Sequence, residues 1–412
     1  MKSDLDQIMQ ANDIDAILVT GPAQHNPGMF YLTGGGHLTS ADLIKKRGEE
    51  PVVFYNPMER DEAAKTGLKG KNLGDYKLTE LLKQSNGDYR QALILRYKRM
   101  LEDLGITSGR LAIYGKMDAG SAYSLFSGLQ DVMERVTLVG EVSDSILLKA
   151  MATKDANEIE RIRHMGKITV DVVGQVADFL ISQNVSNGML VKPGGNPVTV
   201  GDVKAKINLW LAERGAENPE GAIFAIGRDA GVPHSSGNPL DPIRLGQTIV
   251  FDIFPCEGGG GYFYDFTRTW CLGYAPDEVQ QVYENVLEVY NQIMGELKAG
   301  TSCRDYQVRT CELFEAQGHK TIKSDPQTQE GYVHGLGHGV GLQIHEKPSF
   351  SQYAPEDELL SPGAVVTVEP GLYYPERGFG VRLEDTVWVR PDGEMEVLVP
   401  YPMDLVLPVK ES

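Results

Sequence analysis

The sequence predicts an α+β protein of two domains, and three observations carry that prediction. The chain has 412 residues, enough for two domains of ordinary size. Strand-like and helix-like segments alternate over residues 1–145, which is typical of an α/β domain. Beyond a boundary near residue 150, two helices followed by two acidic strands occur in the same order twice.

The amino-terminal domain, residues 1–150, is predicted from short apolar runs separated by helical segments and glycines. Ser3 is placed to cap a short helix that ends near Asn12. A longer helix is expected over 91–104. Strands are expected at 16–19, 30–32 and 51–56, and around Leu111 and Val136. Because this domain carries no dense cluster of histidine or carboxylate, we expect it to shape a site rather than to perform chemistry.

The carboxyl-terminal domain, residues 151–412, is predicted to begin with a long helix near Lys154. Asp155 and Glu158 are spaced as in a capping box, and apolar residues continue to Phe179. Further helices are expected at 202–214, 276–297 and 302–317. Acidic strands are expected at 248–254, 262–270, 365–374 and 381–389. The repeated order suggests two halves packed with pseudo-twofold symmetry around a shared acidic centre.

One carboxylate is expected inside each acidic strand, and these four residues are Asp252, Asp265, Glu369 and Glu384. A buried carboxylate is costly unless it is paired, hydrogen-bonded or bound to a metal. Two of them on neighbouring strands repel each other, and a divalent cation removes that repulsion. The strands are therefore predicted to bring their carboxylates to a metal centre.

A histidine-rich stretch, HGLGHGVGLQIHE, separates the two acidic strand pairs and holds His334, His338 and His345. Histidine binds metals and carries protons near neutral pH. Glycine lets the backbone approach an ion or a substrate closely. Because the stretch has no apolar periodicity, we interpret it as part of a site rather than of a core.

Turn formation is the alternative explanation for several candidates. Asp252 and Asp265 would then flank a hairpin whose loop, PCEGGGG, ends in four consecutive glycines. Glu369 would begin a turn at Pro370–Gly371. A functional role for His234, in the sequence PHSSGNP, competes with an ordinary surface loop.

The choice between Glu384 and Asp385 as a ligand rests on strand alternation. Arg382 lies two residues before Glu384, so a regular strand places these two on one face and Asp385 on the other. We therefore expect Glu384 to be the ligand. Arg382 is suited either to hold a substrate carboxylate or to support the ligands.

Four carboxylates and one imidazole carry too much negative charge for one small divalent ion. The set favours two ions bridged by carboxylates and a water, which yield hydroxide near neutral pH and polarise a carbonyl. Oxygen-dominated ligation favours Mn²⁺, with Co²⁺, Fe²⁺ and Zn²⁺ as alternatives. The predicted chemistry is hydrolysis of an amide or a similar bond.

These motifs resemble those of the pita-bread metallopeptidases, which include prolidase, aminopeptidase P and their creatinase relatives. The resemblance rests on FDIF…YDFTRT, the histidine-rich stretch, VEPGLY and VRLEDT, and it covers the chain from about residue 155. The amino-terminal domain resembles the creatinase-type domain more weakly, through its alternating strands and YLTGG. The resemblance implies an α/β creatinase-like domain followed by a pita-bread catalytic domain.

By this resemblance, Asp252 would bind one metal ion, His338 with Glu369 the other, and Asp265 and Glu384 both. Glu369 would also accept the proton of the attacking water. The family's other histidines bind substrate, transfer protons or stabilise the tetrahedral intermediate. They match His234, His334 and His345.

The reaction implied is hydrolysis of the Xaa–Pro bond at the amino terminus of dipeptides or short peptides, through a hydroxide that bridges the two metals. Dipeptidase and aminopeptidase P activities are both open. The alternative is a non-peptidase enzyme on the same scaffold, either a creatinase-like C–N hydrolase or a metal-dependent lyase acting on a small zwitterion. A metal-free binding module is a third hypothesis, disfavoured because all five ligands are present.

Composition limits the partners. The net charge of −18, with no offsetting basic patch, argues against nucleic acid. No apolar run approaches the length of a membrane span. The acidic start of the chain does not resemble a signal peptide, so we expect a cytoplasmic protein. A homodimer is expected from the family resemblance alone.

Overall fold

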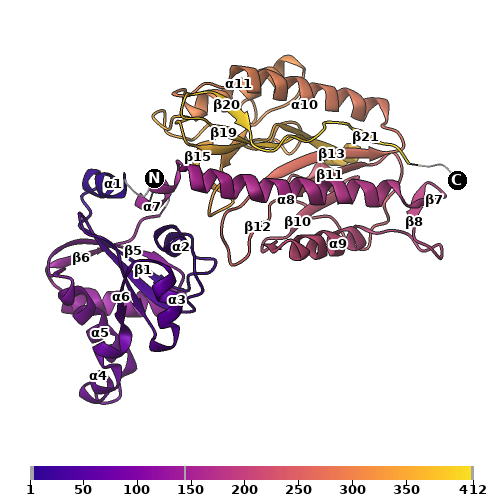
Figure 1. The fold of residues 1–412 in the computed structure, drawn as a ribbon. Helices are drawn as coiled ribbons and strands as arrows, with labels where there is room; N and C mark the ends of the chain where they lie inside the picture. Colours follow the sequence, from indigo (N-terminus) through magenta and orange to yellow (C-terminus); the bar gives the residue numbers. More distant parts are fainter. Residues whose placement is uncertain (1–3, 143–144, 410–412) are drawn as a thin grey trace. The chain divides into compact units, whose positions relative to one another are not determined.

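The computed structural model describes residues 4–142 and 145–409 of the chain (Figure 1). Ser3, the predicted helix cap, lies outside the described residues. The chain divides into two compact units. The first comprises Met1–Met151 with Gly259–Gly261, and the second comprises Ala152–Gly258 with Tyr262–Ser412.

A six-stranded mixed sheet forms the centre of the first unit. Its strands are β1 (Ala16–Gly21), β2 (Ala41–Lys46), β3 (Val52–Tyr55), β4 (Lys69–Asn72), β5 (Gly109–Gly115) and β6 (Val136–Val139). They lie in the order β4-β3-β2-β1-β5-β6. β5 is parallel to both β1 and β6, whereas β2 is antiparallel to both β1 and β3. The sequence did not predict β2, because its apolar run is short and ends in two lysines.

Seven helices of the described residues accompany this sheet. They are α1 (Leu5–Ala11), α2 (Pro27–Thr33), α3 (Arg60–Lys65), α4 (Leu78–Gln84), α5 (Tyr89–Asp103), α6 (Ala119–Val132) and α7 (Ile146–Met151). Residues of α5 and α6 share an apolar core with the strands, including Phe54, Ile94, Leu111 and Leu129. The alternation of helices and strands confirms an α/β amino-terminal unit.

The strand predicted at 30–32 is wrong, because these residues lie in helix α2. The side chain of Asn26 accepts a hydrogen bond from the backbone N–H of Met29, which caps the helix start. Pro27 occupies the first helical turn, and Gly34 ends the helix in a left-handed conformation. Three apolar residues are too few for periodicity to separate a helix from a strand.

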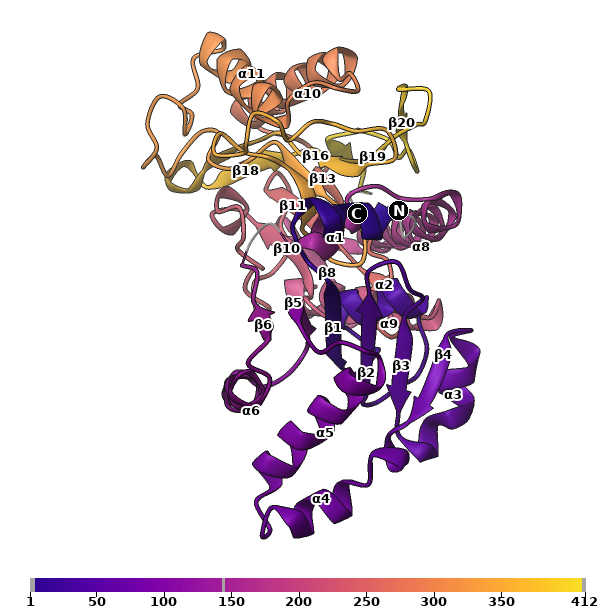
Figure 2. The same cartoon turned by 90° about the vertical axis from the view of Figure 1, so that its left-hand side faces the viewer.

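The same order of elements, two helices followed by several strands, occurs twice in the second unit. Its first half consists of α8 (Ala156–Ile181), α9 (Val200–Glu213), β10 (Ala222–Ile226), β11 (Thr248–Ile253) and β13 (Phe266–Leu272). Its second half consists of α10 (Asp277–Glu296), α11 (Cys303–Ala316), β14 (Gly337–Gly339), β15 (Glu346–Phe350), β16 (Val365–Val368) and β19 (Asp385–Val389). In Figures 1 and 2, α8 and α9 lie on one side of the strands and α10 and α11 on the other.

Two larger sheets and three small ones connect these strands. One larger sheet has the order β10-β11-β13-β21, with β21 at Val406–Leu407, and the other has the order β15-β14-β16-β19-β20, with β20 at Met395–Val397. The small sheets pair β17 (Gly371–Tyr374) with β18 (Phe379–Arg382), β9 (Ala216–Glu217) with β12 (Cys256–Glu257), and β7 (Asn184–Ser186) with β8 (Met189–Val191). β11 and β13 are antiparallel, as the predicted hairpin requires.

Capping fixes the two helices that begin this unit. Asp155 and Glu158 form the predicted capping box of α8, with each side chain bonded to the backbone of the other. Thr199 and Asp202 form a second box at α9, so that helix begins two residues before the predicted position. These local bonds satisfy N–H groups that the first turn leaves without helical partners.

The acidic strands are shorter than predicted, and three of the four carboxylates lie beside a strand rather than inside it. Only Asp252 lies within its strand, β11. Asp265 directly precedes β13, Glu369 directly follows β16, and Glu384 lies between β18 and β19.

Backbone chemistry explains two of these interruptions. Pro370 has no N–H, so the ladder of β16 ends before it. The segment predicted as one strand over 381–389 changes partners midway. Arg382 pairs with Gly371 of β17, whereas Asp385 pairs with Val368 of β16. The residues between them are therefore released from a regular ladder.

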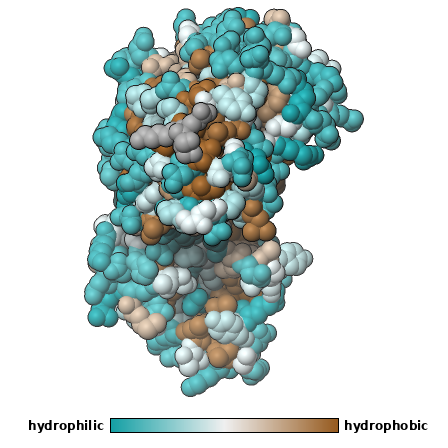
Figure 3. Space-filling view, turned by 90° about the vertical axis from the view of Figure 1, so that its right-hand side faces the viewer, coloured by the Kyte–Doolittle hydropathy of each residue, from teal (hydrophilic) through white to brown (hydrophobic). Residues whose placement is uncertain are grey.

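The polar surface and the short or polar helices agree with the predominantly polar composition of the chain. The face shown in Figure 3 is mostly hydrophilic, with apolar side chains in scattered groups. Over the described ranges 4–142 and 145–409, every helix is too short or too polar to cross a bilayer.

Candidate active site

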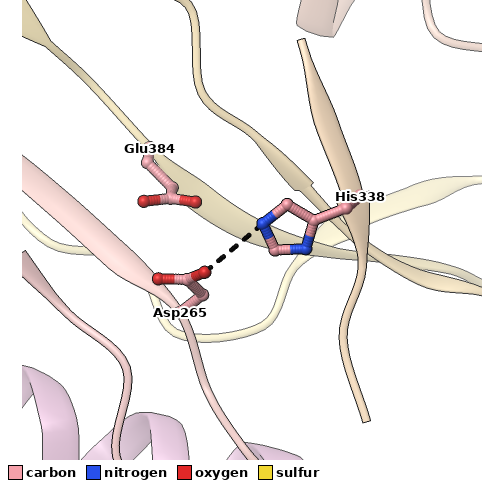
Figure 4. Close-up of side chains that lie close together, drawn as sticks. All are labelled: Asp265, His338 and Glu384. Carbon is pink, nitrogen blue, oxygen red and sulfur yellow. Dashed lines mark ion pairs between the residues drawn. The ribbon is translucent and has the colours of Figure 1, made fainter. Parts of the chain in front are cut away.

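Asp265, His338 and Glu384 converge in the second unit, and their possible ligand atoms all lie within 4.8 Å of one another (Figure 4). The Nε2 atom of His338 is 3.6 Å from Oδ2 of Asp265 and 3.5 Å from Oε1 of Glu369. Both distances exceed a normal hydrogen bond. Such spacing suits atoms that share a cation placed between them.

Asp252 completes the set of five predicted ligands. Its Oδ2 atom accepts a hydrogen bond of 2.6 Å from Nη2 of Arg382, and the residue is 9% exposed. Its negative charge acts on Asp265, Glu369 and Glu384, so it faces the same centre. The structure thus brings all five residues together.

Two buried oxygens of this cluster lack a hydrogen-bond partner among the described residues, Oδ1 of Asp252 and Oε1 of Glu384. An unpaired buried carboxylate oxygen is costly. The other oxygen of Glu384 accepts a 2.6 Å bond from Oγ1 of Thr267. One oxygen of each group is thus held by the protein and the other is left for a cation.

The ring of His338 is oriented as a metal ligand requires. Its Nδ1 atom lies 3.1 Å from the carbonyl oxygen of Gly339, which can only accept, so Nδ1 carries the proton. The lone pair of Nε2 then points toward Asp265 and Glu369. A backbone carbonyl behind the ring is a common support for ligating histidines. The donor set therefore fits a divalent cation.

Burial and the charges of neighbouring groups shift the pKa values of Asp265, Glu384, Glu369 and His338. Burial, reinforced by the neighbouring carboxylates, raises the pKa of both Asp265 and Glu384 well above the ordinary values. Burial also raises the pKa of Glu369 to about 8, against the opposing charge of Arg382. Burial and the nearby His345 lower the pKa of His338 to about 3.

A hydrogen-bonded chain runs from Asp252 through Arg382 and Tyr373 to His334. Nη1 of Arg382 donates to the hydroxyl of Tyr373 at 2.7 Å, and that hydroxyl lies 2.8 Å from Nε2 of His334. Nδ1 of His334 lies 2.7 Å from the carbonyl oxygen of Gly335, so it carries the proton and Nε2 accepts from the tyrosine. Both ring nitrogens of His334 are therefore engaged by the protein.

The other two predicted histidines are exposed at the same site. The ring of His345 meets that of His338 edge to face, with centroids 4.3 Å apart. His234 lies close enough to His334 and His345 for its charge to act on both. Their exposure leaves these two rings accessible to a substrate.

Comparison with known proteins decides the family. Residues 160–391 match the model of metallopeptidase family M24. The chain is 33% identical to the Xaa-Pro dipeptidase of Pyrococcus furiosus, over 95% of this chain and 97% of that protein. The chain belongs to metallopeptidase family M24. Membership confirms the predicted pita-bread metallopeptidase and implies a divalent metal ion in its site.

Solved structures confirm the predicted fold over nearly the whole chain. The Xaa-Pro dipeptidase from Bacillus anthracis has a TM-score of 0.74 at 22% identity, with 98% of this chain and 99% of that chain covered. The X-Pro aminopeptidase from Thermotoga maritima has a TM-score of 0.73 at 22% identity, with 98% and 100% covered. The fold of the M24 chain is thus shared with proteins of both names.

Close backbone packing explains the glycines on either side of His338 in this M24 metallopeptidase. A side-chain carbon on Gly337 would lie 2.1 Å from the carbonyl oxygen of Thr367, and one on Gly339 would lie 2.1 Å from that of Lys347. Only glycine permits these contacts. His338 is held between them by a 3.0 Å bond from its N–H to Oγ1 of Thr367.

The environment of Asp385 separates it from the metal centre. Asp385 accepts a 2.8 Å bond from Nη2 of Arg268, and the hydroxyl of Tyr290 also donates to it. Arg268 donates as well to the backbone oxygens of Thr267 and Glu384. This pair therefore supports the backbone on the outer side of the site, while Glu384 faces inward.

Tyr373 is a site residue that sequence reasoning missed. It sits in the VEPGLYY segment, four residues after Glu369, and offers a hydroxyl to both Arg382 and His334. Its position in an apolar run resembles that of any core tyrosine. The sequence signal that could have identified it is its position four residues after Glu369, within the same VEPGLYY segment.

We expect the substitution Glu384→Gln to raise the melting temperature of chelator-stripped protein and to weaken metal binding. Gln keeps an oxygen for the bond from Thr267 and removes one of the repelling charges. Differential scanning calorimetry with and without added Mn²⁺ measures both effects. A stripped variant less stable than stripped wild type would contradict the repulsion inferred here.

The raised pKa of Glu369 predicts a pH effect on the stripped protein. The folded state keeps a proton that the unfolded state loses above the ordinary pKa of 4.5, so stability falls as pH rises from there toward about 8. Glu369→Gln lacks this group and serves as the reference. Between pH 5 and pH 8, the melting temperature of the wild type should drop by a few degrees more than that of the variant. Parallel curves would contradict the shift.

Proposed function

We propose that this M24 metallopeptidase hydrolyses the Xaa–Pro bond at the amino terminus of dipeptides or short peptides, using two divalent metal ions. The convergence of the five ligands carries the proposal, because it is the arrangement that metal-assisted amide hydrolysis needs. The relative from Pyrococcus furiosus, whose name is Xaa-Pro dipeptidase, supports this choice of substrate.

The ligand set supports two ions. We assign Asp252 to one ion, His338 and Glu369 to the other, and Asp265 and Glu384 to both. The unpaired oxygens of Asp252 and Glu384 favour a cation on their side of the cluster. The distances from His338 favour another beside Glu369 and Asp265.

The negative charge of the cluster also supports two metal ions, and the type of its ligand atoms indicates which metal is favoured. Four carboxylates opposed only by Arg382 leave a net negative centre that two dications neutralise better than one. Oxygen-rich ligation makes Mn²⁺ the favoured ion. Metal analysis of the purified protein distinguishes one equivalent from two.

The chain's own residues have separable roles in this proposal. When bound, the ions supply an activated water and polarise the scissile carbonyl. Glu369 accepts the proton of that water on a carboxylate oxygen, for which its place 3.5 Å from His338 at the same centre suits it. His234 and His345, being exposed, contact the substrate or the tetrahedral intermediate.

His334 and Arg382 have supporting roles in this proposal rather than contacts with the substrate. Arg382 is 2% exposed and donates to Asp252, Tyr373 and Thr267. We therefore favour its supporting role over binding of a substrate carboxylate. His334 accepts from Tyr373 and so stabilises the same chain of hydrogen bonds.

Two properties follow from resemblance more than from the site. We propose a homodimer, which the family resemblance suggests, and a cytoplasmic location. Size-exclusion chromatography with light scattering and fractionation of cells test them separately.

Glu369→Gln should lower turnover of an Xaa–Pro peptide by at least about a hundredfold, because a positioned general base contributes on the order of 10²–10⁴. The variant should fold normally. Glu376→Gln is the matched control, since the side chain of Glu376 is 86% exposed and lies outside the cluster. Full activity in a folded Glu369→Gln protein would refute the assignment of the base.

Substrate length separates two activities that the shared fold leaves open. Chelator-stripped protein is reloaded with Mn²⁺ and given a Xaa–Pro dipeptide and a Xaa–Pro–Yaa tripeptide. Cleavage of the dipeptide alone identifies a dipeptidase, and cleavage of the tripeptide identifies an aminopeptidase. If a protein with two bound metals cuts neither, the Xaa–Pro proposal is wrong, and the C–N hydrolase or lyase takes its place.

A further inference from the structure

The turn that carries His345 is built around a single buried carboxylate, that of Glu346. Oε1 of Glu346 accepts hydrogen bonds from the N–H groups of Leu342 at 2.7 Å and Gln343 at 3.1 Å. Glu346 also pairs with Gly339 where β14 and β15 meet. The side chain of Glu346 therefore fills the tip of the hairpin between the two strands.

Lys154 fixes this carboxylate from a distant part of the unit. Its Nζ atom lies 2.8 Å from Oε2 of Glu346, and the two side chains are 2% and 0% exposed. The backbone N–H of Lys154 donates to the carbonyl oxygen of Gly363 at 2.8 Å, and Asp155 after it caps α8. The lysine is thus anchored to elements outside the hairpin.

The turn has no room for a side chain at Gly341. A side-chain carbon on Gly341 would lie 2.3 Å from Oε2 of Glu346. The glycine therefore allows the backbone to close directly over the Lys154–Glu346 pair.

Stability alone does not explain this ion pair. Moving two charges out of water carries a large desolvation cost, and apolar side chains of similar volume often stabilise a fold as well. A buried ion pair is instead suited to fixing the geometry of the residues around it. The residue before Glu346 is His345, whose ring lies 4.3 Å from that of the metal-site residue His338.

We propose that Lys154 and Glu346 are positioning residues that hold His345 over the metal centre. The inference rests on the proposed function in so far as His345 acts on the substrate. Neither residue touches the reacting atoms, and the proposal assigns their effect on turnover to the position of His345.

A double-mutant cycle tests this dependence. Lys154→Met should lower kcat/KM about tenfold to a hundredfold, because a small displacement of a catalytic group has effects of that size. The loss in Lys154→Met should appear in the same kinetic parameter, kcat or KM, that changes in His345→Ala. In a His345→Ala background, Lys154→Met should have less than about a twofold effect. An equal loss in both backgrounds, or no loss in either, overturns the proposal.

Two further variants control for folding. Lys347→Met removes a lysine of β15 that pairs with Glu358 instead of Glu346, and should leave kcat/KM unchanged. If Lys154→Met does not fold, Glu346→Gln takes its place in the cycle, because it keeps an acceptor for both N–H groups and breaks the ion pair. Bound metal and melting temperature are measured for each protein.

A crystal structure of the Lys154→Met protein tests the inference without any substrate. Displacement of the His345 ring from His338 supports the proposal, and a ring kept at 4.3 Å overturns it. Failure of the wild-type protein to cleave Xaa–Pro peptides refutes only the proposed function. The two ideas are therefore separable.

Discussion

Repulsion between buried carboxylates is the constraint on which the catalytic unit depends. In a medium of low dielectric, like charges a few ångströms apart interact far more strongly than in water. The fold meets this constraint with one protein partner for each group. Arg382 bonds to Asp252, and Thr267 bonds to Glu384. These partners fix the orientation of the carboxylates, but one guanidinium does not balance four carboxylates, so the cluster fits the divalent metal that family M24 implies.

Much of this site was predictable because the ligands stand in distinctive sequence surroundings. An acidic residue among apolar, β-prone neighbours is unusual enough to identify, and Asp252 and Asp265 both have such neighbours. The helix starts were predictable for a local reason, since the capping box of Asp155 and Glu158 needs only three residues of separation. The repeated order of helices and strands then predicted that both halves face one shared acidic centre.

The features that the sequence did not predict depend on tertiary partners. Whether the chain continues as a strand through Glu384 depends on its change from β17 to β16, which no local pattern records. The hydroxyl of Tyr373 is a link only because Arg382 and His334 lie on either side of it. The pairing of Lys154 with Glu346 joins residues that are 192 positions apart.

Interrupted strands present three of the five candidate ligands, Asp265, Glu369 and Glu384, whereas Asp252 and His338 lie within β11 and β14. A carboxylate at a ladder position has its backbone fixed by neighbours on both sides, whereas one at the end of a ladder is free to turn toward the centre. Glu384 shows the consequence. Its N–H donates to the carbonyl oxygen of Thr267 in the first half of the unit, while the next residue pairs within the second half. Because the backbone at this junction is bonded to both halves, the position of the Glu384 carboxylate depends on how the two halves pack together.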